Sequence, residues 1–285
     1  MRHGPECLPT PPCPHQTNFK HLILTMFTTA LHWKSRLTAA GIHLGISLIL
    51  ASLAAALVFG VWYPYPFREI SGGRSLFMLI VSVDVVLGPL LTLAVFNRNK
   101  PLAELRRDLV IIALLQLTAL TYGLWTVAVA RPVYLVFEVD RYRVVHAIEV
   151  HPDSLVNAPP ALQELSWTGP KLISLRDFKN DEERSDLTLA AARGLQISEL
   201  PHMWQSHEQA IPAIQARARS LNELRQRFPE RTDEIDLALR SAGHSTGNTD
   251  SVVYLPLVSR GSQYWTALLD RQTTEIIAYL PLDPL

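Results

Sequence analysis

Residues 76–96 read LFMLIVSVDVVLGPLLTLAVF, and this stretch decides the fold. It is apolar almost throughout, and its length matches the roughly 20 residues that a helix needs to cross a bilayer. One ionisable residue, Asp84, interrupts it, and Gly88 and Pro89 follow shortly after. A carboxyl group inside hydrocarbon is costly unless it is neutral, hydrogen-bonded or turned toward protein. The stretch therefore predicts a membrane helix whose polar residue faces other helices.

Two further stretches are also long and apolar enough to span a membrane. The predicted spans cover residues 39–63, 76–96 and 109–130. In the first span, Gly41 and Gly45 have the small-xxx-small spacing that allows two helices to approach closely. His43 lies between them near the membrane boundary, and we expect its side chain to reach the interface.

Composition limits the other possibilities. The 285 residues leave room for one membrane unit and one modest soluble domain, and the formal net charge of zero gives no indication of a nucleic-acid partner. Cys7 and Cys13 cannot by themselves form a zinc site, and we expect no metal and no cofactor. Residues 1–38 are predicted to be a structureless cytoplasmic segment. Within them, the proline-rich residues 1–25 indicate disorder or a native start downstream, at Met26.

Basic residues in the short connections predict how the spans are oriented, because they favour the cytoplasmic side. The richer segments precede the first span and join the second to the third, with Lys20, Lys34, Arg36, Arg98, Lys100, Arg106 and Arg107. The connection between the first two spans has only Arg68 and Arg74. The N-terminus is therefore predicted to be cytoplasmic, and the residues after Arg131 to lie outside.

Matching depths along the spans gives candidate partners for Asp84. The residues expected at a similar depth are Tyr122, Thr118, Thr121 and Ser52, whereas His43 and Arg106 are expected at the other end of their spans. A membrane carboxyl group can hold helices together, contact a polar group on a partner helix, or belong to a proton or ion pathway. All three interpretations stay open, and helix packing needs the fewest additional groups.

From Arg131 onward the pattern changes to that of a soluble α+β domain over residues 131–285. Val133, Leu135, Phe137 and Val139 alternate with other residues, which predicts a half-buried strand that turns at Asp140–Arg141. Helices are expected over 186–194 (with Ser185 as N-cap), 212–228 and 230–242, and strands over 251–259, 264–270 and 275–282, with turns at Arg260–Gly261 and 272–274. Strands at both ends of the domain predict one antiparallel sheet with helices on one face.

Catalytic motifs are not found in the sequence: there is no GxSxG, HExxH or glycine-rich phosphate loop. His202, His207 and His244 are expected to have structural or surface roles. We therefore do not expect an enzyme.

Three stretches carry a resemblance to a known family: WKSRLTAAGIHLGISL, DVVLGPLLTLAVF and RPVYLVFEVDRYRVV. They resemble the type IV pilin accessory proteins, the TfpX/TfpZ group, and the likeness extends from about Leu31 to the closing strands. The matched motif positions are His43, Asp84, Gly88, Pro89, Arg131, Pro132, Tyr134 and Asp140.

The resemblance implies a chaperone-like accessory factor of the bacterial inner membrane, with a periplasmic C-terminal domain. Its implied partner is the type IV major pilin, whose membrane helix would lie against the three spans and whose globular head would meet the outer domain. A glutamate of that helix would enter a groove lined by Asp84 and Tyr122. Arg131, Pro132 and Tyr134 would form the junction between membrane and domain. The alternatives are an extracytoplasmic ligand sensor with a separate output partner, and a membrane enzyme that modifies pilin.

Overall fold

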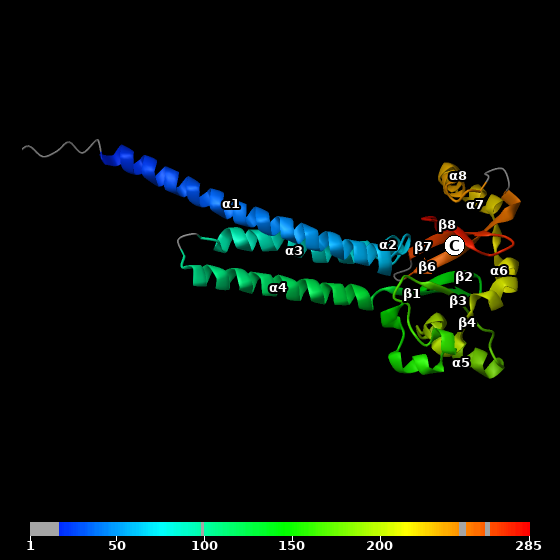
Figure 1. Ribbon diagram of the computed structural model, residues 1–285. Coiled ribbons are helices and arrows are strands. Elements are labelled where there is room, and N and C mark those ends of the chain that lie inside the picture. Colours follow the sequence, from blue (N-terminus) through cyan, green and yellow to red (C-terminus); the bar gives the residue numbers. More distant parts are fainter. Residues whose placement is uncertain (1–16, 98–99, 245–248, 260–262) are drawn as a thin grey trace, which may run out of the picture. The chain divides into compact units, whose positions relative to one another are not determined.

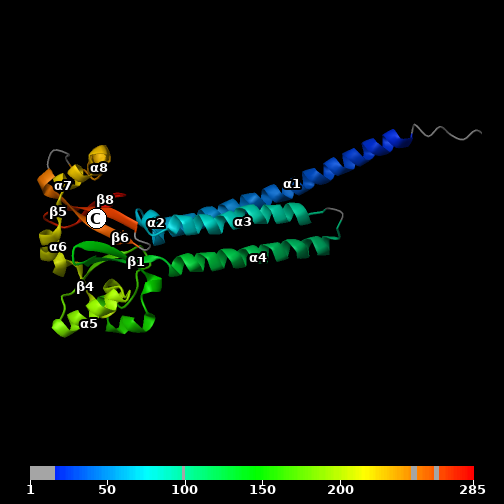
Figure 2. The same cartoon turned by 180° about the vertical axis from the view of Figure 1, so that it is seen from behind.

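The computed structural model describes residues 17–97, 100–244, 249–259 and 263–285. Cys7, Cys13 and the predicted turn at Arg260–Gly261 lie outside these residues. The long helices and the strands of the domain can be followed in Figures 1 and 2. The chain divides into two compact units. Within the described residues, the first unit contains 17–51 and 82–119, and the second contains 52–81 and 120–285.

Three helices of the described chain are long and apolar enough to cross a membrane, over Trp33–Trp62, Gly73–Val95 and Leu102–Val129. They belong to α1 (Thr17–Leu57) with its π-helical end η1 (Val58–Trp62), to α3 (Gly73–Val95) and to α4 (Leu102–Val129). The prediction of three spans is therefore confirmed.

The start of the first helix differs from the prediction. Residues 17–38, assigned from the sequence to a structureless segment, are helical in α1. Lys34 and Arg36 fit a membrane boundary, but such residues are good helix formers and do not end a helix. A charged pair therefore shows where the hydrocarbon begins, and not where the helix begins.

The soluble domain contains one mixed sheet in the order β4-β3-β1-β2-β6-β7-β8, with β5 also paired to β6. The strands are β1 (Pro132–Glu138), β2 (Arg141–His146), β3 (Lys171–Leu175), β4 (Trp204–Ser206), β5 (Arg219–Ser220), β6 (Val252–Ser259), β7 (Gln263–Asp270) and β8 (Ile276–Leu280). The prediction of a purely antiparallel sheet is wrong, because β1 pairs with β3 and β2 pairs with β6 in parallel. Long connections separate these pairs in the chain, and only such connections can join parallel neighbours.

Strand β1 is buried on both faces and not on one. Leu135 and Phe137 belong to a cluster with β6 and β7, whereas Tyr134 and Val136 belong to another cluster that includes Trp204. Val139, predicted to continue the buried face, lies in the turn and is 73% exposed. The alternation in the sequence reflects two apolar faces of different composition.

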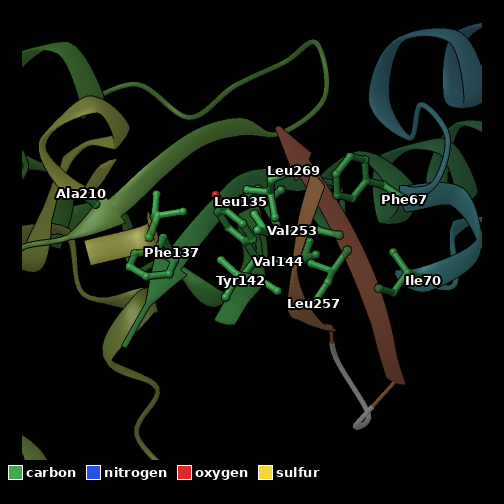
Figure 3. Packing of buried hydrophobic residues seen from close by; sticks show 13 residues of the cluster. Phe67, Ile70, Leu135, Phe137, Tyr142, Val144, Ala210, Val253, Leu257 and Leu269 are labelled. Carbon is green, nitrogen blue, oxygen red and sulfur yellow. The ribbon is translucent and has the colours of Figure 1, made fainter. Parts of the chain in front are cut away.

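A short helix between the first two spans, α2 (Phe67–Ile70), is part of the domain core. Figure 3 shows Phe67 and Ile70 pointing toward β6 and β7, where Val253, Leu257 and Leu269 lie in the same cluster. The connection between α1 and α3 therefore packs into the core of the C-terminal domain.

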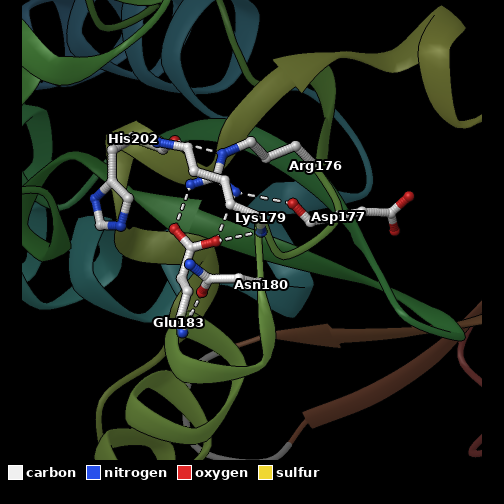
Figure 4. A network of polar contacts seen from close by, with 6 residues as sticks. All are labelled: Arg176, Asp177, Lys179, Asn180, Glu183 and His202. Atoms are coloured by element: carbon white, nitrogen blue, oxygen red, sulfur yellow. Dashed lines mark hydrogen bonds and ion pairs between the residues drawn. The ribbon is translucent and has the colours of Figure 1, made fainter.

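Helix α5 (Asp181–Ala192) begins earlier than predicted, because Asn180 and not Ser185 is its N-cap. The Asn180 side chain accepts a hydrogen bond from the Glu183 backbone N–H at 2.8 Å. Arg176 donates to both carboxylate oxygens of Glu183, at 2.9 and 2.6 Å, and Lys179 donates its backbone N–H (Figure 4). These hydrogen bonds, above all those from Arg176, lower the pKa of Glu183 to about 2. The network fixes the start of α5 against the end of β3.

The helix predicted over 212–228 is two helices, α6 (Ile211–Arg217) and α7 (Leu221–Arg227). Between them, β5 pairs with β6, and Ser220 then caps α7 by accepting from the Glu223 backbone N–H at 3.2 Å. The third predicted helix is α8 (Thr232–Ser241), which ends before Gly243 as expected. Short 3-10 turns complete the domain: η2 (Ala147–Glu149), η3 (Pro152–Asn157), η4 (Pro160–Leu162), η5 (Ile197–Glu199), η6 (Pro201–Met203), η7 (His207–Ala210), η8 (Pro229–Arg231) and η9 (Thr249–Ser251).

Candidate functional site in the membrane helices

One face of α3 carries polar contacts to α1 and α4 within the first unit. Asp84, Gly88 and Thr92 are four residues apart and therefore lie on the same face. Thr92 Oγ1 lies 2.5 Å from Nδ1 of His43 on α1. Gln116 on α4 donates from Nε2 to the backbone carbonyl of Asp84 at 3.1 Å. We call these five residues the α3 polar face, and they connect three helices.

Gly88 provides the space that this arrangement needs. A Cβ atom at this position would lie 2.7 Å from Cδ and 2.9 Å from Oε1 of Gln116. Real Cβ atoms essentially never come so close, so any larger residue would displace the amide. Gly88 therefore permits Gln116 to reach α3, and this accounts for one of the residues singled out from the sequence.

The Asp84 carboxyl group interacts with the Gln116 side chain and, electrostatically, with His43. The expectation that His43 is remote from Asp84 is therefore wrong, whereas its expected reach to the interface stays a prediction. Because α3 begins at Gly73 and not at Leu76, Asp84 lies deeper in its helix than a count from Leu76 gives. The same count from the end of α4 then moves from Tyr122 to Thr118, and it still does not reach Gln116.

Two of the predicted partners have other surroundings. The Thr118 hydroxyl donates to the backbone carbonyl of Leu114 on its own helix, at 2.8 Å. The Tyr122 side chain is 67% exposed, and its ring centroid lies 5.8 Å from that of Trp125. For Thr121 and Ser52, the contact with Asp84 stays a prediction. Pro89 lies inside α3, directly after Gly88.

The glycines of α1 have open surroundings. At Gly41 and Gly45, a Cβ atom would have no neighbour within 4 Å among the described residues. Both residues are exposed, whereas Ala40 and Ser47, on roughly the opposite side of the helix, are buried. We call Gly41 and Gly45 the open glycine face. Their spacing was recognised in the sequence, but the described residues supply no helix that uses it.

The junction residues predicted from the sequence come together in the second unit. Arg131 is 6% exposed, donates to the backbone carbonyls of Ser166 (2.9 Å) and Ala128 (2.8 Å), and lies 3.7 Å from the ring centre of Trp167. Burial lowers the pKa of this guanidinium. The residue thus ties the end of α4 to the loop before β3.

Tyr134 makes a second connection to the same loop. Its hydroxyl group donates toward the backbone carbonyls of Leu162 (3.2 Å) and Glu164 (3.0 Å). Burial raises the pKa of Tyr134 to about 12, so the group remains a neutral donor. Pro132 begins β1 directly after Arg131, and the domain therefore starts without a linker.

No chemistry beyond hydrogen bonding is indicated by these groups. Within residues 17–97, 100–244, 249–259 and 263–285, no three His, Cys, Asp or Glu side chains are placed to hold a metal ion. His207 is buried, and its Nε2 lies 3.0 Å from the Tyr142 hydroxyl, which fits the structural role expected for it. The groups described here are placed for hydrogen bonding and for packing between helices.

Comparisons with known proteins extend this description. Residues 31–72 match the family model of the fimbrial assembly protein FimB. The chain is 36% identical over 233 residues to a fimbrial assembly protein, serogroup I, of Dichelobacter nodosus, covering 81% of this chain and 90% of that relative. A serogroup E1 protein of the same organism is 34% identical with the same coverage, and one of serogroups C1 and C2 is 43% identical over 119 residues, 42% of this chain and 91% of the relative. No solved structure matches.

Proposed function

Because the chain belongs to the fimbrial assembly protein family, we propose that it is a non-catalytic accessory factor that helps a fimbrial subunit to accumulate or assemble. In this proposal the subunit is a type IV major pilin, and the chain is of the TfpX/TfpZ type. The three apolar helices lie in the bacterial inner membrane, with the N-terminus in the cytoplasm and the domain in the periplasm. The basic residues ahead of the apolar stretch 39–63, and those between the stretches 76–96 and 109–130, support this orientation.

The observation that carries the proposal is the open glycine face of α1. Helices associate in lipid mainly through close packing, and glycine allows two backbones to approach. The glycines of α3 and α4 are covered by side chains of this chain, whereas Gly41 and Gly45 are not. An apolar helix of the subunit, laid along this face, would find both the space and the apolar side chains of Ile42 and Ile49 beside it, which are 62% and 63% exposed.

The α3 polar face has a supporting role in this proposal. His43 lies on the same helix as the open glycine face, and its contact with Thr92 sets the rotation of α1 relative to α3 within the first unit. Asp84 and Gln116 hold α4 on the same side of α3. Asp84 thus acts first as a packing residue, and its contact with a polar group of the subunit's helix stays a prediction.

The test is to replace Gly45 by Leu, alone and together with Gly41→Leu. Because no atom lies near either Cβ position, the chain should fold and accumulate normally. The level of the subunit and the number of surface fimbriae should fall several-fold, because the larger side chains separate the two helices. Immunoblots of membranes for both proteins, together with electron microscopy of the cells, measure the two effects.

The matched control is Ala113→Leu, which adds a side chain of the same size to an exposed position of α4. It should leave both proteins and the fimbriae unchanged. Normal fimbriation in the Gly41→Leu, Gly45→Leu double variant would show that this face of α1 is not the docking surface.

A further inference from the structure

An open groove of about 440 Å³ lies beside β8, the last strand of the sheet. Helix α8 forms one wall, and Tyr65, from the segment between η1 and α2, contributes to the other. The lining residues are Tyr65, Glu234, Leu237, Ala238, Ser241, Ala242, Ile277, Ala278, Tyr279, Leu280 and Pro281. We call this the β8 groove, and all of it belongs to the second unit.

The β8 groove runs over the free edge of the sheet, because its lining comes from both faces. Ala278 and Leu280 belong to the cluster under α7 and α8. Tyr279 instead packs on the α2 side, with its ring 5.9 Å from that of Phe67, and Tyr65 lies 6.5 Å from Trp265. A chain segment in the groove would therefore lie alongside β8, between α8 and Tyr65.

The main chain of β8 can pair with such a segment. Antiparallel pairing with β7 uses only one edge of the strand, over Thr266↔Leu280 to Leu269↔Ile276. Among the described residues, no strand pairs with the other edge of β8. Unpaired edges of this kind accept extended peptides, which gain main-chain hydrogen bonds and place alternate side chains in neighbouring pockets. The opposite end of the sheet, β4, has only Trp204–Ser206 and packs against η7.

The charge and polarity of the groove select an uncharged, apolar occupant. Leu237 and Tyr65, which line the groove, are 59% and 56% exposed and add apolar surface to it. Glu234 is the single ionisable acid among the lining residues, and Arg231 already forms an ion pair with it. A charged segment would therefore meet no free counter-charge in the lining.

We infer that the β8 groove binds an extended, uncharged apolar segment of the fimbrial subunit by adding it to the sheet as a strand beside β8. This inference rests on the proposed function. Tyr65 follows η1 after only Tyr63 and Pro64, so the groove begins where α1 leaves the apolar span. A subunit helix that continues along residues 52–62, which belong to the second unit, would end next to this groove.

The test uses the full chain in the membranes of cells that make the subunit. A photo-reactive amino acid replaces Leu237 in one strain and Leu189 in a control strain. Leu189 is similarly exposed (53%) but lies on α5, outside the groove. A third strain carries the photo-reactive residue at Ile49, which is 63% exposed and lies beside the open glycine face. Irradiation should give an adduct with the subunit at Leu237 and at Ile49 but not at Leu189, and mass spectrometry should place the Leu237 adduct in an uncharged apolar stretch of the subunit's soluble part.

The outcomes separate the inference from the function on which it rests. A subunit adduct at Ile49 without one at Leu237 would overturn the inference about the groove and leave the proposed function standing. Absence of a subunit adduct at both positions would count against both. An adduct between two copies of this chain at Leu237 would overturn the inference, because the groove would then be a contact between copies.

Strand addition beside β8 can also be tested by hydrogen exchange. In the complex reconstituted with purified subunit in lipid nanodiscs, backbone amides of β8 that point away from β7 should exchange hydrogen about tenfold more slowly than in the chain alone. Leu237→Arg should remove this protection and lower the amount of complex several-fold, whereas Leu189→Arg should not. Unchanged exchange in β8 with an intact complex would mean that the segment does not pair with the strand.

Discussion

The glycines of α1 and those of α3 and α4 have opposite surroundings. At Gly88 and Gly123, a Cβ atom would lie within 3 Å of side-chain atoms of Gln116 and Ile80, whereas at Gly41 and Gly45 it would meet no atom of the described residues within 4 Å. Glycine in a membrane helix permits close approach to another helix but does not identify that helix. The difference shows that this chain uses Gly88 and Gly123 for its own packing, and it is the reason why we propose the open glycine face of α1 as the docking surface.

The largest effect is expected for Gly123→Leu. The branched side chain of Ile80 lies 2.6 Å from the Cβ position and cannot move aside as an unbranched one could. Overpacking of this kind costs about 3 kcal/mol, which should lower the amount of protein in the membrane about tenfold. Immunoblots of membranes from the variant and from wild type measure this amount. If Gly123→Leu accumulates as well as Gly45→Leu does, covered and open glycines do not differ and the comparison fails.

The next largest loss of stability is expected for Arg131→Ala. Like the covered glycines, Arg131 at the junction is packed against other parts of this chain. The variant loses the hydrogen bonds to Ser166 and Ala128 and the contact with Trp167. Leaving buried carbonyl groups without a donor costs about 2–4 kcal/mol. Thermal unfolding in detergent, followed by tryptophan fluorescence, should show a lower midpoint.

Arg131→Lys is the conservative control for the junction. A lysine keeps the charge but cannot donate in two directions from a planar group, so we expect an intermediate midpoint. A midpoint equal to that of wild type in both variants would mean that the junction does not depend on these contacts.

A smaller effect is expected at Gly88, and it sharpens the comparison because the covering group can be removed. Gly88→Ala should cost about 1–2 kcal/mol by displacing the Gln116 amide from Asp84. With Gln116→Ala already present, the same change should cost almost nothing. Unfolding midpoints of the two single variants and the double variant give the coupling between the sites. Strict additivity would show that Gly88 is not there to accommodate Gln116.

The sequence was informative where one property of a single segment decides the structure. Long apolar runs predicted three spans, and the apolar and proline pattern predicted the change to a soluble domain after Arg131. It was less informative about Asp84, because matching depths requires the true ends of two helices. Correcting the start of α3 moves the matching position on α4 only to Thr118. Depth alone therefore does not find Gln116 and His43, whose contacts depend on how the helices are rotated against one another.

The domain shows the same limit. Local patterns located β1, β2, β6, β7 and β8 but did not give their directions, because parallel pairing depends on connections elsewhere in the chain. The residues Arg219–Ser220 read as helix in their local context and become a strand only because β6 lies beside them. The capping pattern at Ser220 and Glu223 was the one local signal for this break. The covering of Gly88 and the openness of Gly41 have no signal in a single sequence.

Helix α2 has a consequence for the order of events during synthesis. Phe67 and Ile70 leave the ribosome long before β6 and β7, the strands that cover them in the finished core. Until translation is nearly complete and the last strands are in place, these two side chains lack the neighbours that cover them in the finished domain. A chain truncated before β6 would therefore expose an apolar helix, a form that quality-control proteases recognise and remove.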